Sequence, residues 1–365
     1  MGHELFKPET AILVGLETNE NFSLPLAESM AELKRLADTA GIIVIGELTQ
    51  KRPRADRGTY LGEGKLEELK MLVDTLKPDK IIFDSELTPA QERNIEEAMT
   101  EKAMVIDRAA LIIDIFSLHA LSSEGKLQVE LAKLHYQLPR LRGLWGHLNR
   151  QRGGFGMRDS GEQQLETDKR IIKKRITLLK KEIEKVARDR YLRREKRRRE
   201  RIRIISLVGY TNSGKSTLLN ALTKSDAHVE DKLFATLAPT TRRKYLPHGE
   251  TVLFTDTVGF IQKLPHDLVV AFRSTLEEVT EASLLLHVVD ASNPFFEAQI
   301  DAVYRVLEEL NCAAKPMITV FNKIDLLTEK FNDELLIKYQ PAIKISALQK
   351  QGLEELITSL TQQPL

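Results

Sequence analysis

Residues 209–216 read GYTNSGKS, which is the GxxxxGKS spacing of a loop that binds phosphate. The apolar run that ends at Gly209 predicts a buried strand, and the leucines at 218, 219 and 222 predict an amphipathic helix directly after the loop. In this context successive backbone N–H groups and the positive end of the helix can surround a polyphosphate, which a chance glycine turn would not do. We expect Lys215 to neutralise the β and γ phosphates and Ser216 to offer its hydroxyl to Mg²⁺. The loop residues expected to contact a nucleotide are Gly209, Asn212, Ser213, Gly214, Lys215, Ser216 and Thr217.

A threonine beyond the phosphate loop can complete the metal site. Residues 234–243 read FATLAPTTRR and show no periodic pattern, which indicates a loop. A loop threonine about twenty residues after the phosphate loop can reach the metal beside the γ-phosphate. Thr236 fits this spacing best, and Thr240 and Thr241 are alternatives that the sequence does not exclude. The expected nucleotide contacts in this segment are Phe234, Ala235 and Thr236, with Thr236 as a metal ligand.

The next segment with the right chemistry is DTVG at residues 256–259, directly after an expected strand at 251–255. A carboxylate at the end of such a strand can hold Mg²⁺ through water, and a glycine N–H can donate to the γ-phosphate. We expect nucleotide contacts from Asp256, Thr257, Val258 and Gly259, with Asp256 bound to the metal through water. The expected catalytic residues are Lys215, Thr236 and Gly259.

The segment 322–325, NKID, predicts which base the nucleotide carries. The carboxylate of Asp325 can accept both the N1–H and the N2–H₂ of guanine, a pair that adenine lacks, while Lys323 lies over the ring. A buried carboxylate left without these donors is costly, so the preference for guanine can be large. Backbone N–H groups after the strand AIKIS can reach guanine O6. The residues expected around the base are Asn322, Lys323, Ile324, Asp325, Ser346 and Ala347.

The segments around this site predict three parts. Short β-branched runs at 10–17, 41–48, 81–85 and 103–108 alternate with helical patterns, which indicates a small parallel α/β domain over residues 1–113. Thr88 is expected to cap the helix that begins at Pro89. The turn YLGEGK at 60–65 can contact phosphate, but a simple helix start is favoured because its glycines are too close together for a phosphate loop. A GTPase domain is expected over residues 201–365.

Between these domains, residues 114–200 have the pattern of two long helices. Apolar residues three or four apart predict an antiparallel helical hairpin in which each narrow apolar stripe covers the other. The first stripe consists of Leu127, Leu131, Leu134 and Leu138, and the second of Leu165, Ile172, Ile176, Leu179, Ile183 and Val186.

The connection at 140–161 is rich in arginine and glycine and holds the single tryptophan. A solvated tip is the plain alternative, but arginines beside aromatic rings favour irregular or single-stranded RNA. The expected RNA contacts are Arg142, Trp145, Arg150, Arg152, Phe155 and Arg158. The basic segment 188–203 is either a solvated helix or a stripe that binds an RNA backbone, and the neighbouring loop favours RNA.

Composition limits the remaining classes of protein. The chain has 365 residues, of which 42% are hydrophobic and 29% charged, with a net charge of +1. It has no apolar run of about 18 residues, which argues against a membrane span. Its N-terminus lacks the features of a secretion signal, and its one cysteine excludes a disulfide framework. We expect a cytoplasmic monomer, with peripheral association with ribosomes or a membrane left open.

Taken together, these motifs resemble the Ras-related P-loop GTPases, and the whole chain resembles the HflX family of ribosome-associated GTPases. The resemblance rests on YLGEGKLEEL, DRAALIIDIF, EGKLQVELAKLHYQLPRL, GYTNSGKS, FATL, DTVGFIQKLP and NKID. It implies GTP hydrolysis, Mg²⁺ and binding to the large ribosomal subunit and its RNA, with splitting of stalled or vacant ribosomes. A GTP-gated RNA-binding assembly factor is the alternative, and an RNA-stimulated enzyme that binds ATP at its N-terminal domain is a further one.

Two residues modify the expected mechanism. Phe260 stands after DTVG, where Ras-type enzymes place a glutamine that orients water, so we expect slow hydrolysis that a partner accelerates. Asn212 resembles the asparagine of phosphate loops that bind K⁺ beside the phosphates, which suggests K⁺ as a second cation.

The arginine-rich loop departs from the family pattern RGPGETQLE at Asp159, Ser160 and Gln163.

Overall fold

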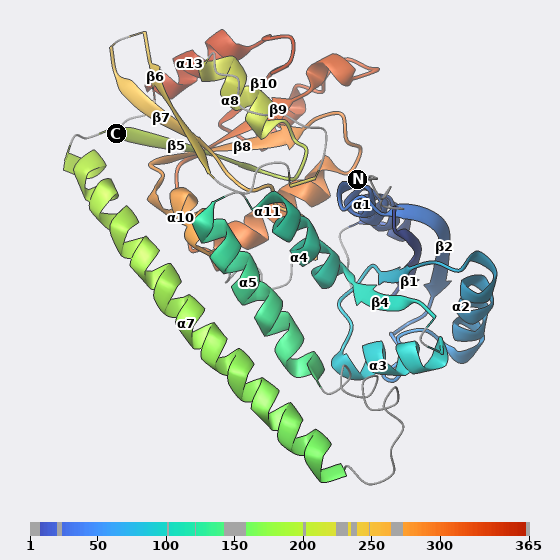
Figure 1. Cartoon of the computed structure of the whole chain (residues 1–365). Helices are drawn as coiled ribbons and strands as arrows, with labels where there is room; N and C mark the ends of the chain where they lie inside the picture. The colour runs from blue at the N-terminus through green and yellow to red at the C-terminus, as the bar shows by residue number, and fades with distance from the viewer. Residues whose placement is uncertain are drawn as a thin grey trace, which may run out of the picture. The chain divides into compact units, whose positions relative to one another are not determined.

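The computed structural model describes residues 8–19, 24–100, 102–120, 122–141, 158–199, 202–223, 233–234, 239–247, 249–263 and 273–362. The chain forms two compact units. The first comprises residues 1–118, 127–183 and 265–268, and the second comprises residues 119–126, 184–264 and 269–365. Each unit is described separately below, with the element labels of Figure 1.

The first unit contains a four-stranded parallel sheet in the order β2-β1-β3-β4. Its strands are β1 (Thr10–Glu17), β2 (Ile43–Lys51), β3 (Lys80–Phe83) and β4 (Met104–Asp107), and α1 (Leu26–Thr39), α2 (Glu63–Leu76) and α3 (Pro89–Ala98) connect them (Figure 1). The expected parallel α/β fold is confirmed. At the start of α3 the Thr88 side chain accepts the N–H of Gln91, and the Gln91 side chain bonds back to Thr88, so the predicted cap is present as a capping box.

The helical segment differs from the sequence expectation at its beginning. A single helical register was expected from residue 114, but the structure has α4 (Arg108–His119), followed by α5 (Ser123–Gln137) and a short 3-10 turn, η1 (Leu138–Arg140). α4 buries Leu111, Ile112, Ile115 and Phe116, which is more than a narrow stripe. This helix therefore belongs to a broad core and not to the helical hairpin, whose first apolar stripe begins at Leu127 of α5.

The two predicted apolar stripes meet in the first unit. α7 (Arg158–Arg199) is a helix of 42 residues and includes the last positions of the segment that was expected to be a loop. Leu131 of α5 packs with Ile176 and Leu179 of α7 in a buried cluster, and partly buried residues extend this seam in both directions. Those residues are Leu127, Leu134, Leu138, Ile172 and Ile183. Arg175 and Glu130 add a bidentate ion pair with N···O distances of 2.7 and 2.8 Å.

The second unit is built on a six-stranded sheet in the order β10-β9-β8-β5-β7-β6, in which only the β6–β7 pairing is antiparallel. The strands are β5 (Arg203–Gly209), β6 (Thr240–Tyr245), β7 (Thr251–Asp256), β8 (Leu284–Asp290), β9 (Met317–Asn322) and β10 (Ala342–Lys344). The helices are α8 (Lys215–Thr223), α10 (Arg273–Glu281), α11 (Phe296–Glu309), α12 (Glu334–Lys338) and α13 (Leu353–Gln362), with the 3-10 turn η2 (Ile324–Leu326) after β9. This is the P-loop GTPase fold that the motifs predicted.

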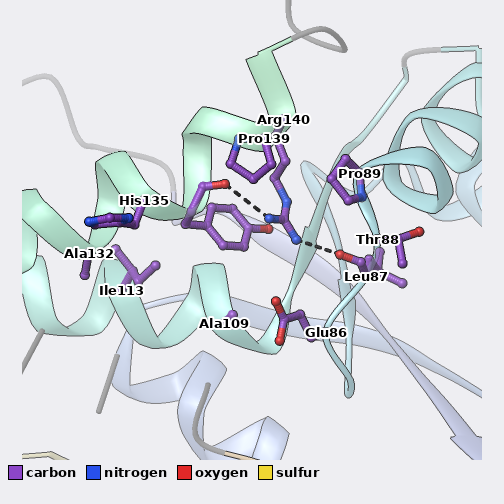
Figure 2. A pocket seen from close by; sticks show the side chains of 11 residues that line it. Glu86, Leu87, Thr88, Pro89, Ala109, Ile113, Ala132, His135, Pro139 and Arg140 are labelled. Atoms are coloured by element: carbon purple, nitrogen blue, oxygen red, sulfur yellow. Dashed lines mark hydrogen bonds between the residues drawn. The ribbon is translucent and has the colours of Figure 1, made fainter. Parts of the chain in front are cut away.

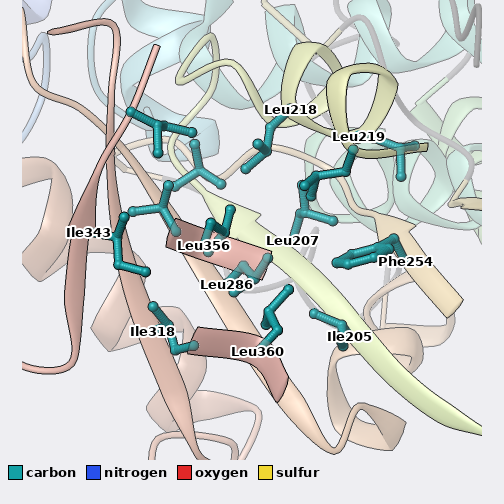
Figure 3. Close-up of a cluster of buried hydrophobic side chains, with 14 of the residues drawn as sticks. Ile205, Leu207, Leu218, Leu219, Phe254, Leu286, Ile318, Ile343, Leu356 and Leu360 are labelled. Atoms are coloured by element: carbon teal, nitrogen blue, oxygen red, sulfur yellow. The ribbon is translucent and has the colours of Figure 1, made fainter. Parts of the chain in front are cut away.

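The core of the second unit holds the phosphate loop in place. Leucines of α8 and α13 pack against the inward side chains of β5, β7, β8 and β9, as Figure 3 shows. Leu207 of β5 and Leu218 of α8 are both fully buried, so the strand before the loop and the helix after it are fixed to one core. Because both ends are held, the loop between them keeps a defined path. In the described part of the chain, no helix has the length and apolar character that crossing a membrane requires.

Candidate nucleotide-binding site

The phosphate loop runs from the end of β5 at Gly209 to Lys215, the first residue of α8. Lys215 is 6% exposed, and its Nζ donates to the carbonyl of Tyr210 at 2.8 Å and to that of Gly209 at 3.2 Å. Burial lowers the pKa of Lys215 to about 8, the nearby Asp256 raises it, and Lys323 lowers it further. A polyphosphate beside Nζ would supply the negative charge that this buried ammonium needs.

Gly214 and Asn322 show why the loop needs a glycine before the lysine. Gly214 has a φ of +92°, and a Cβ atom there would lie 2.2 Å from the side-chain nitrogen of Asn322. That nitrogen donates to the carbonyl of Ser213 at 2.9 Å. The close approach lets Asn322 hold the phosphate loop from the neighbouring segment, and a larger residue at position 214 would break this contact.

Ser216 and Asp256, the two expected metal ligands, lie next to each other. Ser216 lies in the first turn of α8, and Asp256 is the last residue of β7. Ser216 Oγ donates a hydrogen bond to Asp256 Oδ2 at 2.6 Å. A hydroxyl and a carboxylate are oxygen ligands of the kind that Mg²⁺ prefers. The buried hydroxyls of Thr211 and Ser213 have no hydrogen-bond partner among the described residues. Buried hydroxyls in a phosphate loop fit a site that gains its remaining polar contacts from a ligand.

The expected guanine side comes together around Asn322. Its Oδ1 accepts the N–H of Ala347 at 2.9 Å, so one amide side chain joins the phosphate loop to the segment after β10. The N–H of Ser346 donates to the carbonyl of Gln351 at 3.1 Å. Both N–H groups therefore have acceptors within the protein, and contact of Ser346 and Ala347 with guanine stays a prediction.

Lys323 and Asp325 follow β9 as the sequence predicted. Lys323 has a φ of 65°, and its Nζ pairs with Asp290 Oδ2 at 2.7 Å. Asp325 lies in η2 and is partly exposed. The chain therefore turns sharply at Lys323, and Asp325 lies on a short turn directly after a buried strand. This position suits the expected role of the Asp325 carboxylate, which is to accept hydrogen bonds from guanine.

The DTVG segment lies close to the phosphate loop. Thr257 Oγ1 donates to the carbonyl of Leu207 at 2.7 Å, and Val258 is buried. Phe260 is 2% exposed and exchanges backbone hydrogen bonds with the loop. Its side chain offers no group that could orient water.

The structure describes part of the switch segment. Phe234 is buried, whereas Ala235 and Thr236 lie outside the described residues. Thr240 and Thr241 lie in β6, a strand that the sequence did not predict because basic side chains fill its exposed edge positions. Thr241 Oγ1 lies 3.0 Å from Thr255 Oγ1 of β7. The Thr241 hydroxyl is therefore used between strands.

Two side chains near the site carried no sequence signal. Tyr210 stands at a variable position of the motif, yet its hydroxyl accepts the N–H of Gln262 at 2.9 Å. His287 of β8 is 1% exposed, and burial together with the charge of Lys215 lowers its pKa to about 3. It is therefore a neutral core histidine whose ring lies edge-on to Tyr304 at 5.8 Å.

Most of the expected RNA contacts lie outside the described residues: Arg142, Trp145, Arg150, Arg152 and Phe155. Arg158 is the first residue of α7.

Arg140 lies in the arginine-rich connection at 140–161 of the sequence, but the structure shows that it is not part of an exposed loop. It is 8% exposed and donates to Glu92 at 2.7 Å, to the Leu87 carbonyl at 2.6 Å and to Asp107 at 3.3 Å. Arg140 therefore binds α3, β4 and η1 together and is not a surface cation.

A cavity of about 370 Å³ lies beside this network in the first unit, between the residues after β3 and helices α4 and α5 (Figure 2). Arg140 forms one wall, with its guanidinium 3.7 Å from the centre of the Tyr136 ring. Burial raises the pKa of Glu92 to about 7, against the lowering effect of Arg140. The cavity is lined mainly by apolar groups and prolines, including Pro89 and Pro139.

The YLGEGK turn has the geometry of a helix start. Gly62 is the N-cap of α2, and its N–H donates to Gln50 Oε1 at 3.0 Å. Lys65 lies in the first turn of the helix and pairs with Glu68 at 2.8 Å. These contacts fit the simple alternative that the sequence favoured.

Comparison with known proteins agrees with this arrangement over almost the whole chain. Residues 27–117 match the family described as "GTP-binding GTPase N-terminal", residues 119–197 "GTP-binding GTPase Middle Region", and residues 204–323 "50S ribosome-binding GTPase". A GTP-binding protein of Sulfolobus solfataricus, solved in complex with GDP, has a TM-score of 0.50 and 26% identity, and the match covers 97% of this chain and 98% of that one.

Curated relatives are more similar in sequence. "GTPase HflX" of Caldanaerobacter subterraneus is 49% identical over 352 residues, which is 96% of this chain and 80% of the relative. "GTPase HflX" of Escherichia coli is 44% identical over 322 residues, which is 88% of this chain and 74% of the relative. The chain therefore belongs to the HflX family of GTPases and is a GTP-hydrolysing enzyme.

Proposed function

We propose that this GTPase binds the large ribosomal subunit and separates stalled or vacant ribosomes into subunits. The observation that carries the proposal is the match of residues 204–323 to a family described as a 50S ribosome-binding GTPase. The sequence of the arginine-rich segment between α5 and α7 supports it, because arginine and aromatic residues in one short stretch are typical of segments that bind RNA. In this proposal Arg142, Trp145, Arg150, Arg152, Phe155 and Arg158 contact that RNA.

The described site supports specific roles toward Mg²⁺-GTP. Lys215 binds the β and γ phosphates, Ser216 and Asp256 hold the metal, and Asp325 accepts the N–H groups of guanine. Bound Mg²⁺ would neutralise phosphate charge next to Ser216 and Asp256. Gly259 lies next to Lys215, where its N–H can donate to the γ-phosphate once the segment is positioned. Thr236 is the proposed switch threonine.

The same geometry supports slow hydrolysis in the absence of a partner. Phe260 is buried, and its side chain cannot accept or donate a hydrogen bond to the attacking water. We infer that the ribosome orders the missing groups and raises the rate of hydrolysis.

A monovalent cation is a further part of the proposal. Asn212 has a φ of 60°, a left-handed conformation that few residues other than glycine and asparagine adopt readily. Its amide oxygen is the ligand that we propose for K⁺ beside the phosphates, where the ion would stabilise charge in the transition state. Equal rates of GTP hydrolysis in K⁺ and in Na⁺ would remove this proposal.

The experiment that separates splitting from assembly is light scattering of whole ribosomes with catalytic amounts of the protein and GTP. A drop in scattering that requires GTP supports subunit separation. Binding to the large subunit without a drop in scattering supports the assembly function instead.

A further inference from the structure

The first residues of the phosphate loop are hydrogen-bonded to the segment that follows Gly259. The N–H of Thr211 donates to the carbonyl of Phe260 at 2.7 Å, and the N–H of Phe260 donates to the carbonyl of Gly209 at 3.1 Å. Together they form a parallel bridge between Tyr210 and Phe260, beyond the ends of β5 and β7. The sheet pairing therefore continues over the loop that must receive the phosphates.

A side chain adds a third bond to this bridge. The N–H of Gln262 donates to the hydroxyl oxygen of Tyr210 at 2.9 Å. Tyr210 is 4% exposed and Gln262 is 8% exposed, so water has little access to the contact. Leaving a buried N–H without an acceptor costs more free energy than leaving an exposed one. The bond from Gln262 to Tyr210 therefore holds residues 259–262 firmly against the phosphate loop.

The bridge places Gly259 tightly against the phosphate loop. A Cβ atom on Gly259 would lie 2.8 Å from Thr211 Cα and 3.0 Å from Lys215 Nζ. A γ-phosphoryl group is larger than a methyl group, and it must lie beside the lysine. This close approach disfavours a group placed between Gly259 and Lys215, whereas the α and β phosphates lie within the curve of the loop backbone.

We propose that Tyr210 is a positioning residue whose hydroxyl acts as a latch that holds residues 259–262 against the phosphate loop. With this latch the enzyme binds GTP less tightly than it would without the hydroxyl, and its affinity for GDP is unaffected. The latch ties the arrival of the γ-phosphate to the release of the segment that carries Phe260. It thereby sets how far the protein favours GTP over GDP. This inference concerns nucleotide binding and does not depend on a ribosomal partner.

The direct test is Tyr210→Phe, which removes only the hydroxyl. Fluorescence titration measures Kd for GDP and for a non-hydrolysable GTP analogue, both with Mg²⁺. We expect the Kd of the analogue to fall roughly two- to tenfold, the effect of one net hydrogen bond, with the Kd of GDP unchanged. Tyr304→Phe is the matched control, because Tyr304 is a partly buried tyrosine of α11 that packs against His287. It should leave both constants unchanged.

Amide hydrogen exchange gives a second readout that does not rely on affinity. In the wild type, residues 259–262 should exchange slowly with GDP bound and faster with the analogue bound. Tyr210→Phe should show the faster exchange already with GDP. The proposal is overturned if Tyr210→Phe leaves the ratio of the two Kd values unchanged, weakens both nucleotides equally, or leaves exchange at 259–262 as in the wild type.

Discussion

Ser216 Oγ donates a hydrogen bond of 2.6 Å to Asp256 Oδ2, which joins the first turn of α8 to the end of β7 across 40 positions of the chain. Both residues are attached to elements of one core, which includes Leu218 and Leu219 of α8 and Phe254 of β7 (Figure 3). Packing therefore holds Ser216 and Asp256, the two residues proposed to bind Mg²⁺, next to each other.

Replacing Ser216 with alanine removes the hydroxyl that is proposed to bind Mg²⁺, without adding bulk. We expect GTP turnover to fall about 100-fold, as when one group that stabilises transition-state charge is lost. The measurement is phosphate release over a range of Mg²⁺ concentrations. Ser283→Ala is the control, because the Ser283 hydroxyl donates to the Ile204 carbonyl at an exposed position. Turnover of Ser216→Ala equal to that of the control would contradict the role of Ser216.

Asp325→Asn tests the base that the site accepts. Asparagine places an N–H₂ group where a carboxylate stood, so it repels the N–H groups of guanine and suits the carbonyl of xanthine. We expect GTP affinity to fall by about 100-fold or more and xanthosine triphosphate to become the better ligand. Competition titrations measure both affinities, and Asp333→Asn, which alters an exposed pair with Lys344, is the control. An unchanged preference for GTP would show that Asp325 does not recognise the base.

The pKa of Lys215 predicts a proton linked to nucleotide binding. Burial holds this pKa near 8 in the protein alone, and phosphates beside Nζ raise it. The charged form binds phosphate better, so affinity for GDP is greatest below this pKa and falls as pH rises through it. Calorimetry in buffers of different ionisation heat should show proton uptake at about pH 9 and almost none at about pH 6.5. Equal proton uptake at the two pH values would contradict the assignment of this proton to Lys215.

The Arg140 network predicts a large effect on stability. Arg140→Ala removes the cation that is paired with the buried carboxylates of Glu92 and Asp107, although the N–H groups of Leu87 and Ala110 still donate to Asp107. We expect the free energy of unfolding to fall by about 3–5 kcal/mol. Denaturant unfolding provides the measurement. Arg175→Ala removes an exposed pair with Glu130 and should have a much smaller effect. Similar losses for both variants would show that the network contributes little.

The site could be predicted from sequence where spacing carries the chemistry. GYTNSGKS, DTVG and NKID each follow a buried strand, and parallel strands bring their carboxyl ends to one edge of the sheet. The contacts of Ser216 with Asp256 and of Asn322 with the phosphate loop follow from that placement. The heptad stripes likewise predicted the seam between α5 and α7, because a narrow stripe needs a partner helix.

Other features depend on tertiary contacts that no local pattern encodes. Arg140 lies in a basic stretch, and only the fold shows that Glu92 and Asp107 surround it. β6 is an edge strand, so its sequence lacks the apolar alternation of a buried strand. The bond from Gln262 to Tyr210 joins a variable motif position to a residue 52 positions away.

The central claim is that the ribosome stimulates this GTPase through the segment between α5 and α7. The most direct measurement is GTP turnover with and without large ribosomal subunits, for the wild type and for a variant that lacks residues 143–156. We predict strong stimulation of the wild type and little stimulation of the variant, with equal turnover of the two proteins alone. A wild type that large subunits do not stimulate would contradict the ribosomal function, and full stimulation of the variant would contradict the role of this segment.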